Sequence, residues 1–224
     1  MTRQMMDQPT EKHEEPVVPE KPVPEKSVIR QYAEAFIIAI VLALVIRTFV
    51  VQAFKIPSGS MLPTLQIGDH ILVNKFLYGA ELPFTDYHLP GLRAPQHGDI
   101  IVFKFPQDDG RDFIKRVIAL PGERVEVRGR QVYINDKPLQ ELYAVHLDRA
   151  IQENPLSPRD SFGPVVVPPG QLFMMGDNRD YSMDSRFWGF LDMKKIKGKA
   201  FIIYWSWDRD SFRPRLGRIG MLIR

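Results

Sequence analysis

Cysteine is absent from this sequence of 224 residues. Its absence excludes disulfide bonds, thiol catalysis and cysteine-ligated metal sites, although it does not identify the cellular compartment. The sequence also lacks the His-Glu-x-x-His motif of zinc peptidases, any Ser-x-x-Lys motif and any glycine-rich phosphate loop. The five histidines are scattered and form no evident set of metal ligands.

Positive charge is only slightly in excess, since the net charge is +3. The basic residues gather near the end of the sequence, at Arg209, Arg213, Arg215, Arg218 and Arg224. Such a cluster is suited to anionic lipid headgroups or to nucleic acid, and a solvated basic tail is the simpler interpretation.

The composition is that of a globular protein, with 44% hydrophobic and 25% charged residues. The length allows one domain of ordinary size with appendages. Residues 1–30 differ from the rest, because proline alternates there with Glu, Lys and Val. They carry too little large apolar surface to fold, so we predict a disordered tail.

An apolar segment follows this tail. Ala35–Ile46 is a run of twelve residues without a polar group, and Tyr32–Phe54 together makes 23 residues, or about 34 Å of helix. A cleaved signal peptide is the alternative, but its apolar core would begin unusually late and no small-x-small site follows promptly. We therefore predict a transmembrane helix over residues 31–54. Basic residues flank both ends, so charge does not determine its orientation.

From Asp69 onward, apolar residues alternate with polar ones and turn residues separate the alternating segments. This pattern predicts strands and no long helix, and therefore a mainly antiparallel β domain over residues 55–224. Residues 137–168 are polar and proline-containing, and we interpret them as an insertion or flap, a smaller β subdomain. The predicted strands are His70–Phe76, Asp99–Phe105, Phe113–Leu120, Arg124–Arg128, Gln131–Ile134, Leu172–Met175 and Phe201–Trp205.

Two serines lie in a proline-framed stretch between the apolar segment and the β domain. Ser58 and Ser60 flank a glycine, and Pro57 and Pro63 restrict the backbone on either side. The hydroxyls are therefore expected on a rigid, irregular loop. An ordinary Ser/Gly/Pro turn is the simpler interpretation of such a cluster.

Lys115 lies in a strand pattern and shares its face with apolar neighbours such as Phe113 and Val117. Burial of a lysine disfavours the ammonium and lowers its pKa, which would make the side chain a usable general base. The simpler alternative is a lysine at a strand edge that reaches water. Lys104 alternates with apolar residues in the same way, so periodicity does not choose between the two.

Residues 174–189 contain three aspartates and one asparagine. A calcium loop starting at Asp177 would require glycine at its sixth position and glutamate at its twelfth, where this sequence has Ser182 and Trp188. We therefore predict a loop stiffened by Asp/Arg pairs rather than a metal site. A Ser60/His97/Asp99 triad is a further possibility, although Ser60 lacks the Gly-x-Ser-x-Gly elbow.

Four stretches taken together resemble the bacterial type I signal peptidases, which are membrane-anchored Ser–Lys proteases. They are Pro57–Leu65, His97–Phe103, Phe113–Gly122 and Gly176–Arg186, in the order of the family. His97 stands where the family usually has arginine. The similarity extends from about Tyr32 to Trp205.

The resemblance implies roles for the residues of these stretches. Ser60 matches the nucleophile, and Lys115, rather than Lys104, matches the general base. The Ser60 amide and the Ser58 hydroxyl match the oxyanion hole, and Ser182 matches a serine that hydrogen-bonds the catalytic lysine. A serine needs such an adjacent base because its hydroxyl is almost un-ionised at neutral pH. This chemistry requires no metal and no cofactor.

Further residues match the family's supporting and substrate-binding positions. Asp184 and Arg186 match a salt-bridged pair beside the site, while Asp177 and Arg179 of the same motif are expected to be structural. The candidates for the shallow apolar pockets of the substrate site are Ile56, Pro57, Ile114 and Met174.

The resemblance also implies substrates and a location. The substrates would be preproteins with small residues at the first and third positions before the cut. The partners would be these preproteins and the lipid bilayer, with no nucleic acid. The enzyme would be a single-pass protein of the cytoplasmic membrane, with its catalytic domain on the outer or periplasmic side. The alternatives are a specialised pilin or conjugation-factor peptidase and a catalytically silent domain that binds peptide or lipid.

Overall fold

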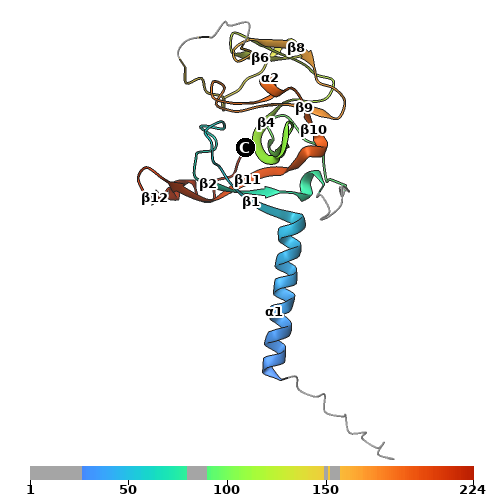
Figure 1. Cartoon of the computed structure of the whole chain (residues 1–224), viewed down its shortest axis with the longest axis vertical. Coiled ribbons are helices and arrows are strands. Elements are labelled where there is room, and N and C mark those ends of the chain that lie inside the picture. Colours follow the sequence, from blue (N-terminus) through green and yellow to red (C-terminus); the bar gives the residue numbers. More distant parts are fainter. Residues whose placement is uncertain (1–26, 80–89, 149–150, 152–156) are drawn as a thin grey trace, which may run out of the picture. The chain divides into compact units, whose positions relative to one another are not determined.

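The structure is a computed structural model that describes residues 27–79, 90–148, 151 and 157–224. It contains one long apolar helix near the N-terminus, followed by strands that pair antiparallel (Figure 1). The expected mainly β fold class is therefore confirmed. Most of the predicted tail, residues 1–26, lies outside the described residues. Residues 1–40 and 41–224 form two units.

The long helix α1 spans Val28–Val45 and none of its residues is buried. Its 18 residues correspond to about 27 Å, and its length and apolar composition allow it to cross a membrane. The prediction that helix continues to Phe54 was wrong. A π-helical turn, η1 (Ile46–Val50), follows α1 and leads into strand β1 (Val51–Lys55). The backbone is extended there because β1 pairs with β2 and Phe54 packs against the core.

The larger sheet has the strand order β1-β2-β11-β3-β4-β9-β10, and β12 pairs with β11. Its further strands are β2 (Asp69–Asn74), β3 (Ile100–Phe105), β4 (Asp108–Ala119), β9 (Gln171–Met175), β10 (Leu191–Asp192), β11 (Ile196–Asp208) and β12 (Arg213–Pro214). The short helices are η2 (Phe76–Tyr78), α2 (Ser185–Trp188), η3 (Met193–Lys195) and η4 (Leu216–Arg218).

The smaller sheet has the order β7-β6-β5-β8 and lies beyond β9 and α2 in Figure 1. Its strands are β5 (Arg124–Arg128), β6 (Gln131–Ile134), β7 (Lys137–Pro138) and β8 (Phe162–Val166). Gly129 and Arg130 both have positive φ, which suits the two-residue hairpin between β5 and β6. The segment predicted as an insertion, 137–168, thus contributes β7 and β8 to a sheet that begins earlier, at β5.

Residues on both sides of Ser58 and Ser60 pack into the hydrophobic core. Met61 and Leu65 are fully buried and pack with Ile56 and Ile71 in one hydrophobic cluster. Burial of side chains of this size stabilises the fold by about 1.5–3 kcal/mol each. The loop that carries Ser58 and Ser60 is therefore anchored to the sheet on either side.

Gly198 in β11 is required by close contact with β2. An added Cβ would lie 2.3 Å from the backbone oxygen of Asn74, and the residue has a φ of +155°. We expect Gly198→Ala to lower the free energy of unfolding of the full-length protein by about 1–3 kcal/mol, measured by denaturant titration in detergent. Gly217→Ala is the control, because an added Cβ meets open space there. Equal stability of the two variants would contradict this account.

Candidate active site

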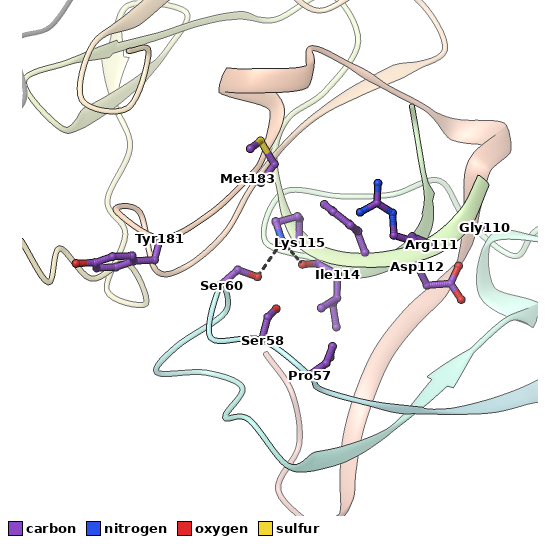
Figure 2. Close-up of a pocket in the computed structure, with 11 residues that line it drawn as sticks. Pro57, Ser58, Ser60, Gly110, Arg111, Asp112, Ile114, Lys115, Tyr181 and Met183 are labelled. Carbon is purple, nitrogen blue, oxygen red and sulfur yellow. Dashed lines mark hydrogen bonds between the residues drawn. The ribbon is translucent and has the colours of Figure 1, made fainter. Parts of the chain in front are cut away.

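Ser60 and Lys115 meet on the floor of a surface cavity. The Lys115 Nζ atom lies 2.9 Å from Ser60 Oγ and 3.0 Å from the carbonyl oxygen of Ile114 (Figure 2). Both side chains are buried, with 8% of Ser60 and 4% of Lys115 exposed. Strand β4 fixes the lysine, because Lys115 is paired with Ile101 of β3 in the larger sheet. A proton can therefore pass directly between the hydroxyl and the amine.

Burial lowers the pKa of Lys115 to about 8, against the opposing pull of the Asp184 and Asp177 carboxylates. The carboxylates raise the pKa only in part, because each is already paired with an arginine. At pH 7 roughly a tenth of such a lysine is neutral, whereas an ordinary lysine is less than about a thousandth neutral. The neutral amine can accept a proton, which the ammonium cannot.

The alternative bases lie elsewhere. His97 contacts the carbonyl oxygen of Ile118 through Nδ1 and Glu123 through Nε2, at 2.8 and 3.0 Å. Asp99 forms ion pairs with Arg93 and Lys199. The Ser60/His97/Asp99 triad considered from the sequence is therefore not assembled.

The cavity above this pair has a volume of about 630 Å³. Three of the predicted site residues besides Ser60 and Lys115 line it, namely Pro57, Ser58 and Ile114. Its remaining lining residues, which the sequence reasoning missed, are Gly110, Arg111, Asp112, Phe113, Tyr181 and Met183. Tyr181 and Met183 are the two neighbours of Ser182 in the 174–189 stretch. Their position beside a predicted site residue could have identified them as cavity residues.

Two predicted pocket residues do not line this cavity. Ile56 is 2% exposed and packs in the core, and it borders only a smaller cavity of about 30 Å³ beside Pro57 and Ile114. Met174 is fully buried in a different cluster, because β9 pairs it with Val117 of β4. Met174 therefore lies in the core, where the sheet holds its side chain, and not in the lining of this cavity.

The structure does not give Lys115 the hydrogen bond to Ser182 that the resemblance implies. Ser182 is buried, and its hydroxyl acts on the Asp184 carboxylate, whose pKa it helps to lower, whereas Lys115 donates to Ser60 and Ile114. It packs closely over Gly176, where an added Cβ would lie 2.3 Å from Ser182 Oγ and 2.4 Å from the Ser60 carbonyl oxygen. Glycine at position 176 therefore permits the two serines to lie on either side of it.

Asp184 and Arg186 form the predicted ion pair, at 2.8 Å, and both are buried. Asp184 also accepts hydrogen bonds from the backbone amides of Gly176 and Arg186, and so caps α2. Burial alone would raise the pKa of Asp184, but the charge and hydrogen bonds of Arg186 hold it below its ordinary value. The pair fixes the end of the loop that carries Ser182.

A second buried ion pair joins the same loop to β4. Arg116 donates two hydrogen bonds of 2.7 Å to the two carboxylate oxygens of Asp177, and Thr64 donates a third. A bidentate pair of this kind is among the strong charge-assisted interactions in proteins. Because Thr64 follows the serine stretch, Asp177 ties that stretch to the strand that carries Lys115.

Asn178 clamps the nucleophile loop directly. Its amide N–H donates to the Ser60 carbonyl oxygen and its side-chain Nδ2 donates to the Gly59 carbonyl oxygen, both at 3.1 Å. The sequence pattern carries no signal for this contact, which joins residues 119 positions apart. The geometry of Ser60 therefore depends on a residue that does not line the cavity.

The segment predicted as an insertion supports this arrangement from the far side. Arg179 pairs with Glu141, the Arg116 guanidinium lies 3.8 Å from the ring centre of Tyr143, and Val145 forms a parallel bridge with Asn178. Part of the segment 137–168 thus stiffens the loop beside the candidate site.

Comparisons with known proteins agree with the resemblance. Residues 29–205 match the family model described as "Signal peptidase, peptidase S26". The chain therefore belongs to the signal peptidase family of peptidases. Within it, the chain is a peptidase of the signal peptidase I type, as the following relatives show.

The signal peptidase I of Pseudomonas aeruginosa is 36% identical, over 93% of this chain and 84% of that protein. A probable signal peptidase I-1 of Synechocystis is 42% identical, over 81% of this chain and 85% of that protein. A solved signal peptidase I from Enterococcus faecalis is 36% identical, with a TM-score of 0.41 over 49% of this chain and 98% of that one. Family membership identifies the activity as removal of signal peptides by a serine peptidase.

If Asn178 positions the nucleophile, Asn178→Ala should lower kcat by about 10- to 100-fold and leave KM nearly unchanged, because a misplaced nucleophile loses near-attack geometry. The backbone bond to Ser60 persists in this variant, so the melting temperature should change little. Steady-state cleavage of a preprotein in detergent measures both constants. Gln107→Ala removes an exposed side-chain amide elsewhere and serves as control. An unchanged kcat would contradict the positioning role.

Proposed function

We propose that Ser60 is the nucleophile and Lys115 the general base of signal-peptide cleavage. The observation that carries this proposal is the 2.9 Å contact between Ser60 Oγ and the Nζ atom of a buried lysine. The neutral amine accepts the Ser60 proton as Oγ attacks the scissile carbonyl, and the resulting ammonium protonates the leaving amine. Lys115 then activates the water that hydrolyses the acyl-enzyme and frees Ser60.

The tetrahedral oxyanion would be held by the Ser60 amide and the Ser58 hydroxyl. Ser58 is exposed and lines the same cavity as Ser60, which supports this assignment. Removal of one oxyanion-hole donor typically costs about 3–4 kcal/mol of transition-state stabilisation. The Asp184–Arg186 pair would contribute indirectly, by holding the loop that packs on Ser60.

The substrate would bind as an extended strand along β4. Residues 112–115 pair with β3 on one side, whereas pairing with β9 begins only at Arg116. The other edge of this segment borders the cavity, where backbone groups can pair with a peptide. Pro57, Ile114 and Met183 would offer apolar contacts to the small residues at the first and third positions before the cut.

The membrane would be the second partner, with α1 as the anchor. By family likeness we place the protein in the cytoplasmic membrane, single-pass, with the catalytic domain on the outer or periplasmic side. The C-terminal arginines are only partly available for headgroups, because Arg218 pairs with Asp69 and Arg215 hydrogen-bonds Gln66. The aromatic side chains of Trp205, Trp207 and Phe212 are exposed beside them.

The catalytic assignment predicts that Ser60→Ala and Lys115→Ala each abolish cleavage of a model preprotein in detergent, by at least about 10³-fold. Lys115→Arg should be equally inactive, because arginine does not act as a base near neutral pH. Mass analysis of the products locates the cut. His97→Ala should retain activity, since His97 contacts neither residue.

Each alternative gives a different result in this experiment. Activity retained in Lys115→Ala and lost in His97→Ala would replace the dyad with a triad. Absence of cleavage of every Ala-x-Ala preprotein by the wild type would favour a silent binding domain. Cleavage confined to one pilin-like or conjugation substrate in a panel would favour the specialised peptidase.

A further inference from the structure

Three lysines converge on a second cavity of about 210 Å³, which shares no lining residue with the active-site cavity in the described parts of the chain. Lys75, Lys104 and Lys197 line it together with Gln52 and Ile196. All three lysines are half-buried. The cavity is thus lined by three ammonium groups and one side-chain amide, which are hydrogen-bond donors suited to an anionic group.

The strand arrangement brings these lysines together at one end of the larger sheet. Lys75 directly follows β2, Lys104 is the penultimate residue of β3, and Lys197 is the second residue of β11. The Lys75 amide donates to the Val50 carbonyl oxygen, which places this end of the sheet beside the start of β1. Lys197 pairs with Asp112, at 2.7 Å, and Lys75 and Lys104 likewise make interactions of their own.

A neighbouring cavity of about 800 Å³ borders the lysine cavity, because Gln52 and Lys75 line both. Its remaining wall is mostly apolar and includes the last turn of α1. These other lining residues are Leu44, Arg47, Val51, Ala53 and Leu72. Apolar side chains beside an arginine and a lysine are typical of a membrane–water interface, where long basic side chains reach the headgroups.

We propose that these two adjacent cavities bind one anionic phospholipid, with its phosphate among Lys75, Lys104 and Gln52. Its glycerol and upper acyl chains would lie against Leu44 and Leu72. A free phosphate would leave this apolar wall unused, and a lipid uses both cavities. The proposal rests on the proposed role of α1 as a membrane anchor, since the helix end then lies at headgroup depth. The bound lipid would fix the base of the catalytic domain at the bilayer surface.

The test uses full-length protein in neutral detergent micelles and native mass spectrometry with phosphatidylglycerol or phosphatidylcholine. We expect the wild type to retain phosphatidylglycerol preferentially. The double variant Lys75→Gln/Lys104→Gln should lose roughly tenfold or more of that preference, because each basic residue near anionic lipid contributes substantially. Lys137→Gln/Lys194→Gln removes the same charge from exposed positions outside both cavities, and it should behave as the wild type.

The outcomes distinguish a lipid site from a simple anion site and from no site at all. Equal phosphatidylglycerol retention by the wild type and the Lys75/Lys104 double variant would overturn the proposal. Displacement of the lipid by millimolar inorganic phosphate would also overturn it, in favour of a site for small anions. Peptide cleavage in detergent should be unchanged in both double variants, which shows that they fold. Because cleavage is measured separately, failure of the lipid proposal is distinguishable from failure of the proposed catalytic function.

Discussion

Burial of the Lys115 amine against Ser60 is the interaction on which the rest of the site depends. A lysine in water is almost fully protonated at neutral pH and cannot serve as a base. Here the loss of hydration lowers the pKa of Lys115 to about 8, and the same burial puts Nζ 2.9 Å from the hydroxyl that it would activate. One structural fact therefore provides both the protonation state and the geometry.

Maintaining a low lysine pKa requires control of nearby negative charge. Asp177 and Asp184 both act on Lys115, and a free carboxylate at either position would favour its ammonium form. Arg116 and Arg186 pair with these two residues at 2.7 and 2.8 Å and offset much of their charge. The Arg116–Asp177 pair, together with the hydrogen bond from Thr64 to Asp177, also connects β4, the serine loop and the 176–186 loop. Electrostatic control and mechanical support thus come from the same residues.

The sequence pattern predicted those strands and turns that are specified by residues close together in the sequence. The strands β5 and β6 have the predicted bounds, since alternation and a Gly129–Arg130 turn specify a hairpin by themselves. The helix end was missed, because β1 forms only through pairing with β2, which lies on the other side of the serine-containing stretch.

The site was predicted unevenly for the same reason. Alternation left Lys104 and Lys115 equivalent, and only the fold and the family resemblance separate them. The Asn178 clamp and the cavity residues Arg111 and Asp112 carry no local signal, because contacts between distant loops and the early start of β4 create them. Met174 lies in the core rather than in the cavity lining because strand pairing, rather than its place in a motif, decides which face it occupies.

The most direct test of this account is a pH titration of the Lys115 side-chain nitrogen by NMR in the full-length protein, with Lys115→Arg used to assign its signal. Burial predicts a midpoint near 8, with the neutral form increasing as pH rises, and cleavage activity increasing through the same range. A midpoint near the ordinary lysine value of 10.5 would contradict the central claim.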